Sequence, residues 1–167
     1  ESAGARNVKA FRAGSFAFNH DTLGALHNVG IGVDASYNAT MFGPQSGVRP
    51  GELLTDSLDC NGVIELPMTV FRDGLRRLRH VQLTACSWTE IESLLWKALR
   101  QSQRSFVILS HNFELLDPSK SRPDDVVVRR FRNLCEFLER NAEDFRIRSL
   151  DTYRPRVADS QAAHLRV

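Results

Sequence analysis

Short apolar segments alternate with amphipathic helical segments, and this alternation constrains the fold more than any other feature. Residues 62–71 (GVIELPMTVF) and 106–112 (FVILSHN) have the composition of strands. Between them, apolar residues repeat at helical spacing, at Ile91, Leu94, Leu95, Ala98 and Leu99. Strands that alternate with such helices are typical of parallel βαβ units with right-handed crossovers. The pattern therefore predicts an α/β fold.

Capping residues predict where the helices begin. Ser87 and Glu90 have the S-x-x-E spacing of a capping box, directly before the apolar repeat. Two more helices are expected to begin at polar residues that can cap them, at Asn19 or Asp21 and at Asp124 or Asp125. Three amphipathic helices are thus expected.

Further strands are expected at residues 8–14, 31–36 and 145–153. Residues 37–61 are rich in Gly, Pro, Ser, Asn and Asp and have no period, which indicates a long surface connection. Connections of this length are often binding or lid segments. Residues 154–167 lack a clear pattern and are expected to form a fraying tail.

The charges are nearly balanced. The chain has 22 Lys and Arg against 20 Asp and Glu, a formal net charge of +2, which does not favour nucleic acid as a partner. Arginines cluster in one short segment, at Arg72, Arg76, Arg77 and Arg79. A solvated helix face is the expected interpretation of this cluster, with an anion site as the alternative.

No apolar stretch approaches the ~18 consecutive residues that a membrane-spanning helix needs, so no membrane span is expected. Cys60, Cys86 and Cys135 are odd in number and have no C-x-x-C spacing. Reduced structural thiols are the simplest interpretation, and they favour a cytoplasmic location.

Two polar residues lie at the carboxyl ends of expected strands. Arg12 lies near the end of the strand at 8–14, and His111 lies at the end of the strand at 106–112. In α/β folds the chemistry collects at these ends, so both residues are expected on one face of the molecule. A hydrogen-bonded structural histidine and an ion-paired surface arginine are the alternatives.

Other polar residues carry weaker signals. Asp34 fits a turn or cap, because Asp-x-Ser favours local hydrogen bonds to the backbone. Glu65 either faces the mouth of a barrel or pairs with an arginine. His20 and His27 lie seven residues apart without an accompanying carboxylate or thiol, so we expect them to be structural or solvated.

Four segments together resemble the polysaccharide deacetylases, which are metal-dependent carbohydrate esterases. They are FRAGSFAFN (11–19), GIGVDAS (30–36), GVIELPMT (62–69) and ILSHNFEL (108–115), and their order matches that of the family. The resemblance implies a distorted (β/α) barrel with parallel strands. It also implies removal of acetyl groups from the amino sugars of a cell-surface polysaccharide or a sugar precursor.

The resemblance assigns a role to each matching residue. Arg12 would orient the catalytic carboxylate, and a fixed guanidinium is suited to this because it binds a carboxylate bidentately. The backbone N–H of Ser15 would lie near the oxyanion, and Leu109 and Asp34 would contact the substrate. His111 would be the general acid, a role that contributes ~10²–10⁴-fold in rate.

The chain departs from the family before Arg12, where the acidic motif and the histidine pair of the family are not found. Residues 1–153 are therefore expected to be the C-terminal portion of such a domain, lacking its N-terminal third. A divalent metal, zinc, would be bound by residues outside this chain, and the remaining N-terminal part would be a partner. The alternative is a non-catalytic carbohydrate-binding or pseudo-enzyme module of the same fold.

Overall fold

A computed structural model describes residues 4, 7–41, 48, 53–150 and 152–153. The described residues form a mixed α/β structure with three α-helices, α1 (His20–Asn28), α2 (Trp88–Arg100) and α3 (Asp125–Arg140). Two 3₁₀ helices are η1 (Gly14–Phe16) and η2 (Asn112–Leu115). The strands are β1 (Ala10–Phe11), β2 (Val33–Asp34), β3 (Leu58–Cys60), β4 (Val63–Glu65), β5 (Val70–Arg72) and β6 (Leu78–His80).

The main sheet has the strand order β1-β2-β4-β3. β1, β2 and β4 are parallel, and Phe11, Asp34 and Glu65 lie beside one another in register. β3 pairs with β4 in the antiparallel direction. β5 and β6 form a separate antiparallel hairpin. The carboxyl ends of three strands therefore meet at one edge of the main sheet.

The helices begin where the sequence predicts. Asn19 caps α1, and its side chain accepts a hydrogen bond from the backbone N–H of Thr22. Ser87 and Glu90 form a reciprocal capping box at the start of α2. Asp124 caps α3 through the N–H groups of Val126 and Val127. Each cap satisfies backbone donors that have no partner inside the helix.

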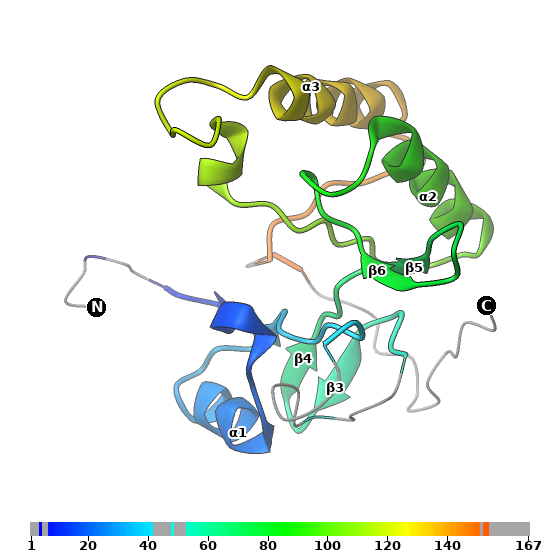
Figure 1. Ribbon diagram of the computed structural model, residues 1–167. Coiled ribbons are helices and arrows are strands. Elements are labelled where there is room, and N and C mark those ends of the chain that lie inside the picture. The colour runs from blue at the N-terminus through cyan, green and yellow to red at the C-terminus, as the bar shows by residue number, and fades with distance from the viewer. Residues whose placement is uncertain (1–3, 5–6, 42–47, 49–52, 151, 154–167) are drawn as a thin grey trace.

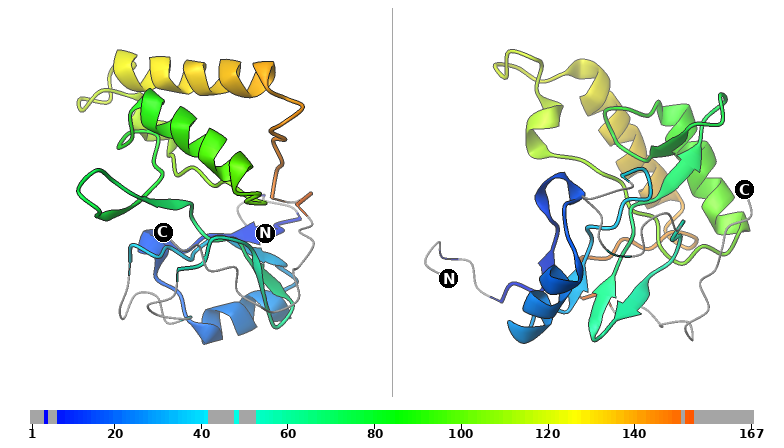
Figure 2. Two further views of the ribbon diagram at one scale, coloured as in Figure 1. Left: turned by 90° about the vertical axis from the view of Figure 1, so that its right-hand side faces the viewer. Right: turned by 60° about the horizontal axis from the view of Figure 1, so that its bottom comes forward.

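Two apolar cores organise the chain. The first is built by α1 and the main sheet, with Leu23, Leu26 and Val63 fully buried. The second is built by α2 and α3, where Phe137 contacts the rings of Trp88 and Trp96 edge-on. Figures 1 and 2 show α2 and α3 side by side, with α1 on the opposite side of the molecule. Each fully buried Leu or Phe contributes about 1.5–3 kcal/mol.

Three sequence predictions are corrected by the structure. Residues 106–112 form a single bridge, between Leu109 and Gln82, rather than a full strand. Residues 145–150 form no strand, because no described segment pairs with their backbone. The arginine cluster at 72–79 lies on the β5–β6 hairpin and its turn, not on a helix.

The expected connection at 37–61 contains β3, and its residues 42–47 and 49–52 lie outside the described part of the chain. The predicted tail at 154–167 and residue 151 also lie outside it. Among the described elements the strands do not close into a barrel. None of the helices built from described residues is long and apolar enough to span a bilayer.

Candidate functional site

The carboxyl edge of the main sheet brings together segments that are distant in the sequence. Phe16 follows β1, Met68 follows β4, and both pack against Leu109 in a small buried cluster. Leu109 is held there by the backbone, since its N–H donates to the carbonyl of Val81 and its carbonyl accepts from the N–H of Leu83. The segment that carries His111 therefore lies at this edge of the sheet.

His111 is held by a carboxylate from its own loop. Its Nδ1 lies 3.1 Å from Oε1 of Glu114, and its backbone N–H donates to Oε2 of Glu114 at 3.2 Å. The imidazole ring also stacks on Phe113, with 5.1 Å between the ring centroids. The His111 side chain is 39% exposed and that of Glu114 only 13%. The ring is thus fixed in orientation and still reachable from solvent.

Glu114 connects His111 to a longer polar network. Gln82 Nε2 donates to Glu114 Oε1 at 2.8 Å, and its amide oxygen lies 3.3 Å from Nε2 of His80. His80 Nδ1 lies 3.2 Å from the hydroxyl of Thr40, in the segment that follows β2. The two histidines are therefore linked through the side chains of Glu114 and Gln82, and Thr40 extends the network to a third segment. With Nδ1 donating a hydrogen bond to Glu114, Nε2 is the ring nitrogen that remains to donate a proton to a bound molecule or to accept one from it.

Asp34 and Glu65 form a buried carboxyl pair beneath this edge. Both residues are 0% exposed and are register partners on β2 and β4. Asp34 Oδ1 accepts from the Ser36 hydroxyl at 2.6 Å, and Glu65 Oε1 accepts from the N–H of Tyr37 at 2.9 Å. The second oxygen of each carboxyl, Asp34 Oδ2 and Glu65 Oε2, has no other hydrogen-bond partner.

A proton on Glu65 directed at Asp34 would give both of these oxygens a partner. Burial and the charge of Asp34 raise the pKa of Glu65 to about 10, and a hydrogen bond to Asp34 acts in the same direction. Burial also raises the pKa of Asp34, although hydrogen bonds from Glu65 and Ser36 oppose this. Two adjacent buried carboxyls cannot both be charged without a large cost, so the pair retains a proton.

The pair also supports the turn after β1. The Ser36 hydroxyl, which donates to Asp34, accepts a hydrogen bond from the N–H of Ala13 at 2.8 Å. The chain then passes through Ser15 and Phe16, which have φ values of +53° and +56°. Consecutive non-glycine residues in this region are strained, and such strain is commonly found at functional sites. The buried acids thus hold a strained turn at the edge of the sheet.

Arg12 lies apart from this network. It is exposed at the end of β1 and lines a groove of about 580 Å³ together with Ala35, Leu66 and Ile108. Arg12 follows β1, and His111 follows Leu109, which packs against Phe16 at the carboxyl edge of the main sheet. No hydrogen bond or ion pair joins Arg12 and His111 among the described residues.

The structure places the other sequence-predicted site residues as follows. Ser15 lies in the strained turn, and its backbone N–H remains a candidate donor. Leu109 is 5% exposed, which leaves little of its surface for an acyl group. Asp34 is fully enclosed and accepts a hydrogen bond from Ser36, as expected of a turn residue, and its contact with a substrate stays a prediction.

Sequence reasoning missed Glu114, Gln82 and His80. The His-x-x-Glu spacing of His111 and Glu114 is that of a capping box, and this signal was sufficient to suggest the contact. No local signal links Gln82 to Glu114, because the two residues meet only through the bridge between Gln82 and Leu109.

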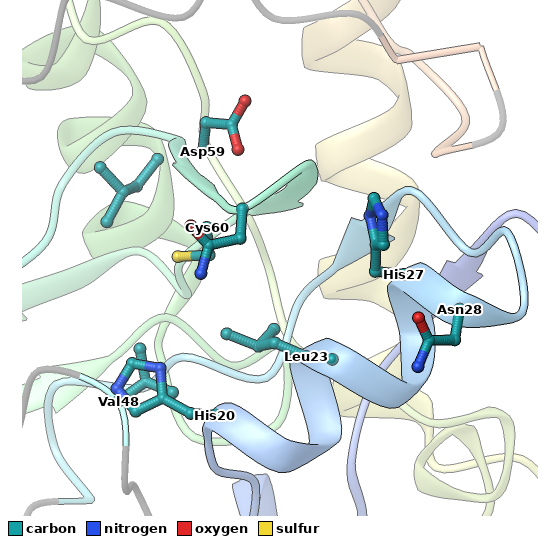
Figure 3. Close-up of a pocket in the computed structure, with 10 residues that line it drawn as sticks. His20, Leu23, His27, Asn28, Val48, Asp59 and Cys60 are labelled. Carbon is teal, nitrogen blue, oxygen red and sulfur yellow. The ribbon is translucent and has the colours of Figure 1, made fainter.

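The described residues do not fit the divalent metal that the resemblance implies, because no three His, Cys, Asp or Glu side chains among them are grouped to bind a metal ion. A separate pocket of about 350 Å³ lies between α1 and β3 and includes His20, His27 and Cys60. Figure 3 shows the two histidines at opposite ends of α1, with Leu23 between them. We therefore assign no metal site to this pocket.

Known protein families, curated proteins and solved structures were each compared with the chain, and none of the three gives a significant match. The function is accordingly inferred from the residues and their geometry.

Proposed function

We propose that this chain is part of a hydrolase that removes acetyl groups from the amino sugars of a polysaccharide, resembling the polysaccharide deacetylases. The observation that carries the proposal is the His111–Glu114 pair, which follows Leu109 where that residue packs against Phe16 of the strained turn, at the carboxyl edge of the main sheet. An oriented imidazole that solvent reaches is the group expected of a general acid near neutral pH.

In the proposed reaction, a water molecule activated by residues outside this chain adds to the acetyl carbonyl. The carbon–nitrogen bond then breaks, and the nitrogen of the sugar takes a proton from His111 Nε2. Acetate and the free amine are released. Glu114 is a positioning residue, because it holds Nδ1 and so directs Nε2 toward the substrate.

The backbone around Ser15 has a second role in the proposal. Its left-handed conformation turns the chain sharply after β1, at the edge where Leu109 is packed. A backbone N–H in such a turn is suited to stabilising the oxyanion of the tetrahedral intermediate. Arg12, two residues before the turn, would bind the catalytic carboxylate, which this chain does not supply.

The proposal places the main sheet in a distorted barrel that polypeptide outside these residues completes. That polypeptide would supply the acidic motif, the metal ligands and the closing strands. The metal, when bound, would supply an activated water molecule. The described residues form no ligand set for it, so we assign none of them to the metal.

The second candidate is a pseudo-enzyme module that binds acetylated sugars without hydrolysing them, and it accounts for the family's acidic motif and histidine pair not being found in the 167 residues. Such a module would retain the site geometry and lack the activated water. It predicts saturable sugar binding without acetate release.

Acetate release from an N-acetylglucosamine oligosaccharide tests the proposal, with His111→Ala introduced into the intact domain. We expect the variant to lose about 10²–10⁴-fold in kcat. His20→Ala, an exposed histidine on α1, is the matched control and should leave the rate unchanged. A loss of less than tenfold in the His111 variant would exclude its role as the acid. Sugar binding without any acetate release by the unmodified domain would favour the pseudo-enzyme.

A further inference from the structure

The groove that contains Arg12 has features that the proposed reaction does not use. Its volume of about 580 Å³ is large enough for several residues of a bound chain, and it lies between β1, residues 104–108 and four residues near the C-terminal end of the described chain, Arg146, Arg148, Leu150 and Tyr153. The His111–Glu114 pair is not part of its lining. The groove is therefore a second feature beside the candidate site.

The groove is strongly cationic. Four arginines line it, Arg12, Arg104, Arg146 and Arg148, and no acidic residue is among the described residues of its wall. Arg104 has an acidic neighbour in Asp56, at 3.8 Å. Arg12, Arg146 and Arg148 make no ion pair with any described residue. The net charge of the whole chain is only +2, so this gathering of guanidinium groups is local.

Apart from Ser105 and Tyr153, the remaining lining is apolar. Ala10, Ala35 and Leu66 contribute from three neighbouring segments of the main sheet. Among the described strands, β1 lies at the edge of this sheet and pairs only with β2. Across the groove, residues 146–148 form no strand, and Ile147 is 76% exposed. An edge strand with free N–H and C=O groups is a template for another strand.

We propose that this groove binds an extended peptide segment that bears carboxylates alternating with apolar side chains and pairs with the free edge of β1. Alternate side chains of a strand point to opposite faces, so one set can contact the apolar floor while the other reaches the arginines. Guanidinium groups bind carboxylates through two parallel hydrogen bonds. An acidic saccharide would satisfy the arginines but would leave the strand edge and the apolar floor unused.

The inference does not require the proposed hydrolysis, because it needs a carboxylate-bearing polypeptide and no reaction. A strand that completed a barrel would compete with the peptide for the edge of β1, so the binding test uses the 167-residue chain alone. Only Arg12 is shared by the two proposals, and in both it binds a carboxylate. Loss of acetate release on replacing His111 therefore says nothing about the groove, and peptide binding says nothing about the acid.

Fluorescence anisotropy of labelled octapeptides with the 167-residue chain tests the inference. The probe alternates Val and Asp, and two control peptides replace Asp by Asn or by Lys. We expect the Asp peptide to bind at least about tenfold more tightly than the Asn peptide, and the Lys peptide not to bind. The affinity should fall as the salt concentration rises. Equal affinity for the Asp and Asn peptides would overturn the proposal.

Variants and a modified peptide locate the binding. Arg146→Ala and Arg148→Ala should each weaken the Asp peptide about tenfold, while Arg132→Ala, an exposed arginine on α3, should have no effect. Two further versions of the Asp peptide carry N-methyl groups on every second backbone nitrogen, one starting at an odd position and the other at an even position. One of the two should not bind, because its methyl groups replace the N–H groups that donate to β1. Binding that survives methylation in both registers, or tight binding of an oligogalacturonate in place of the peptide, would contradict the inference.

Discussion

Two carboxyl networks lie at the carboxyl edge of the sheet, and they differ in their access to water. Asp34 and Glu65 are completely enclosed between β2, β4 and the segments that follow them. Glu114 and His111 lie on a loop beyond Leu109, and the histidine side chain is 39% exposed. The first network retains its proton because neither carboxyl has water to stabilise its charge. The second is in contact with solvent through the His111 ring.

This difference in exposure separates a network that stabilises the fold from one that can take part in a reaction. A buried carboxyl pair sharing a proton fixes the positions of Tyr37 and Ser36, and through Ser36 the turn that leads to Ser15. An exposed His–Glu pair adds little to stability but orients one reactive nitrogen. We therefore expect changes in the first network to alter folding and changes in the second to alter the rate.

The largest effect on stability is expected from Glu65→Leu. The change removes the buried carboxyl that accepts from the Tyr37 N–H and that hydrogen-bonds to Asp34, which costs about 3 kcal/mol in the free energy of unfolding. Denaturation by urea measures the loss. Glu65→Gln is the matched control, because an amide keeps one acceptor and one donor, and its cost should stay within about 1 kcal/mol. Equal losses in both variants would mean that the proton is not shared.

Glu114→Ala should lower the rate of acetate release and leave the stability almost unchanged, the opposite of Glu65→Leu. We expect kcat for acetate release by the intact domain to fall about 10–100-fold with little change in KM, because His111 loses the group that orients it. Stability should change by less than about 1 kcal/mol, since the pair is partly exposed. Glu136→Ala, on the exposed face of α3, is the control. Rescue of most of the rate by Glu114→Gln would support positioning, and its pH–rate profile would show whether charge is needed as well.

The buried pair also predicts how stability depends on pH. The folded-state pKa of Glu65 lies above its ordinary value of 4.5, so the folded protein keeps a proton that the unfolded chain releases. The stabilisation is fully present below pH 4.5 and is lost as the pH rises toward about 10. The slope is at most about 1.4 kcal/mol per pH unit. Urea denaturation from pH 5 to pH 8 should show this decline in the unmodified chain and a smaller one in Glu65→Gln.

The helix caps give the smallest expected effect and compare the two halves of the molecule. Asn19→Ala in the α1 half and Ser87→Ala in the α2 half should each lower the free energy of unfolding by about 1 kcal/mol. Ser93→Ala, at an exposed position inside α2, should be neutral or slightly stabilising. A loss at only one cap would show that the two halves do not unfold as one cooperative unit.

Local signals predicted the helices well and the strands less well. The caps at Asn19, Ser87 and Asp124 act within one turn, so residue types and spacing were enough to find them. The segment at 145–150 has the alternation of a strand, but a strand also needs a partner, and alternation does not provide one. The arginines at 72–79 were assigned to a helix face from their charge alone, and charge does not distinguish a helix from the β5–β6 hairpin on which they lie.

The sequence by itself determined the α/β class, the starts of the helices and the placement of His111 after an apolar segment, because these depend on periodicity and on contacts within a few residues. Only the tertiary structure decided that Asp34 meets Glu65 in a buried pair and that Gln82 reaches Glu114. These contacts join residues about 30 positions apart, and they depend on strand register and burial. Burial sets the free-energy cost of a charged carboxyl, so a glutamate stabilises the fold at position 65 and orients a histidine for the proposed reaction at position 114.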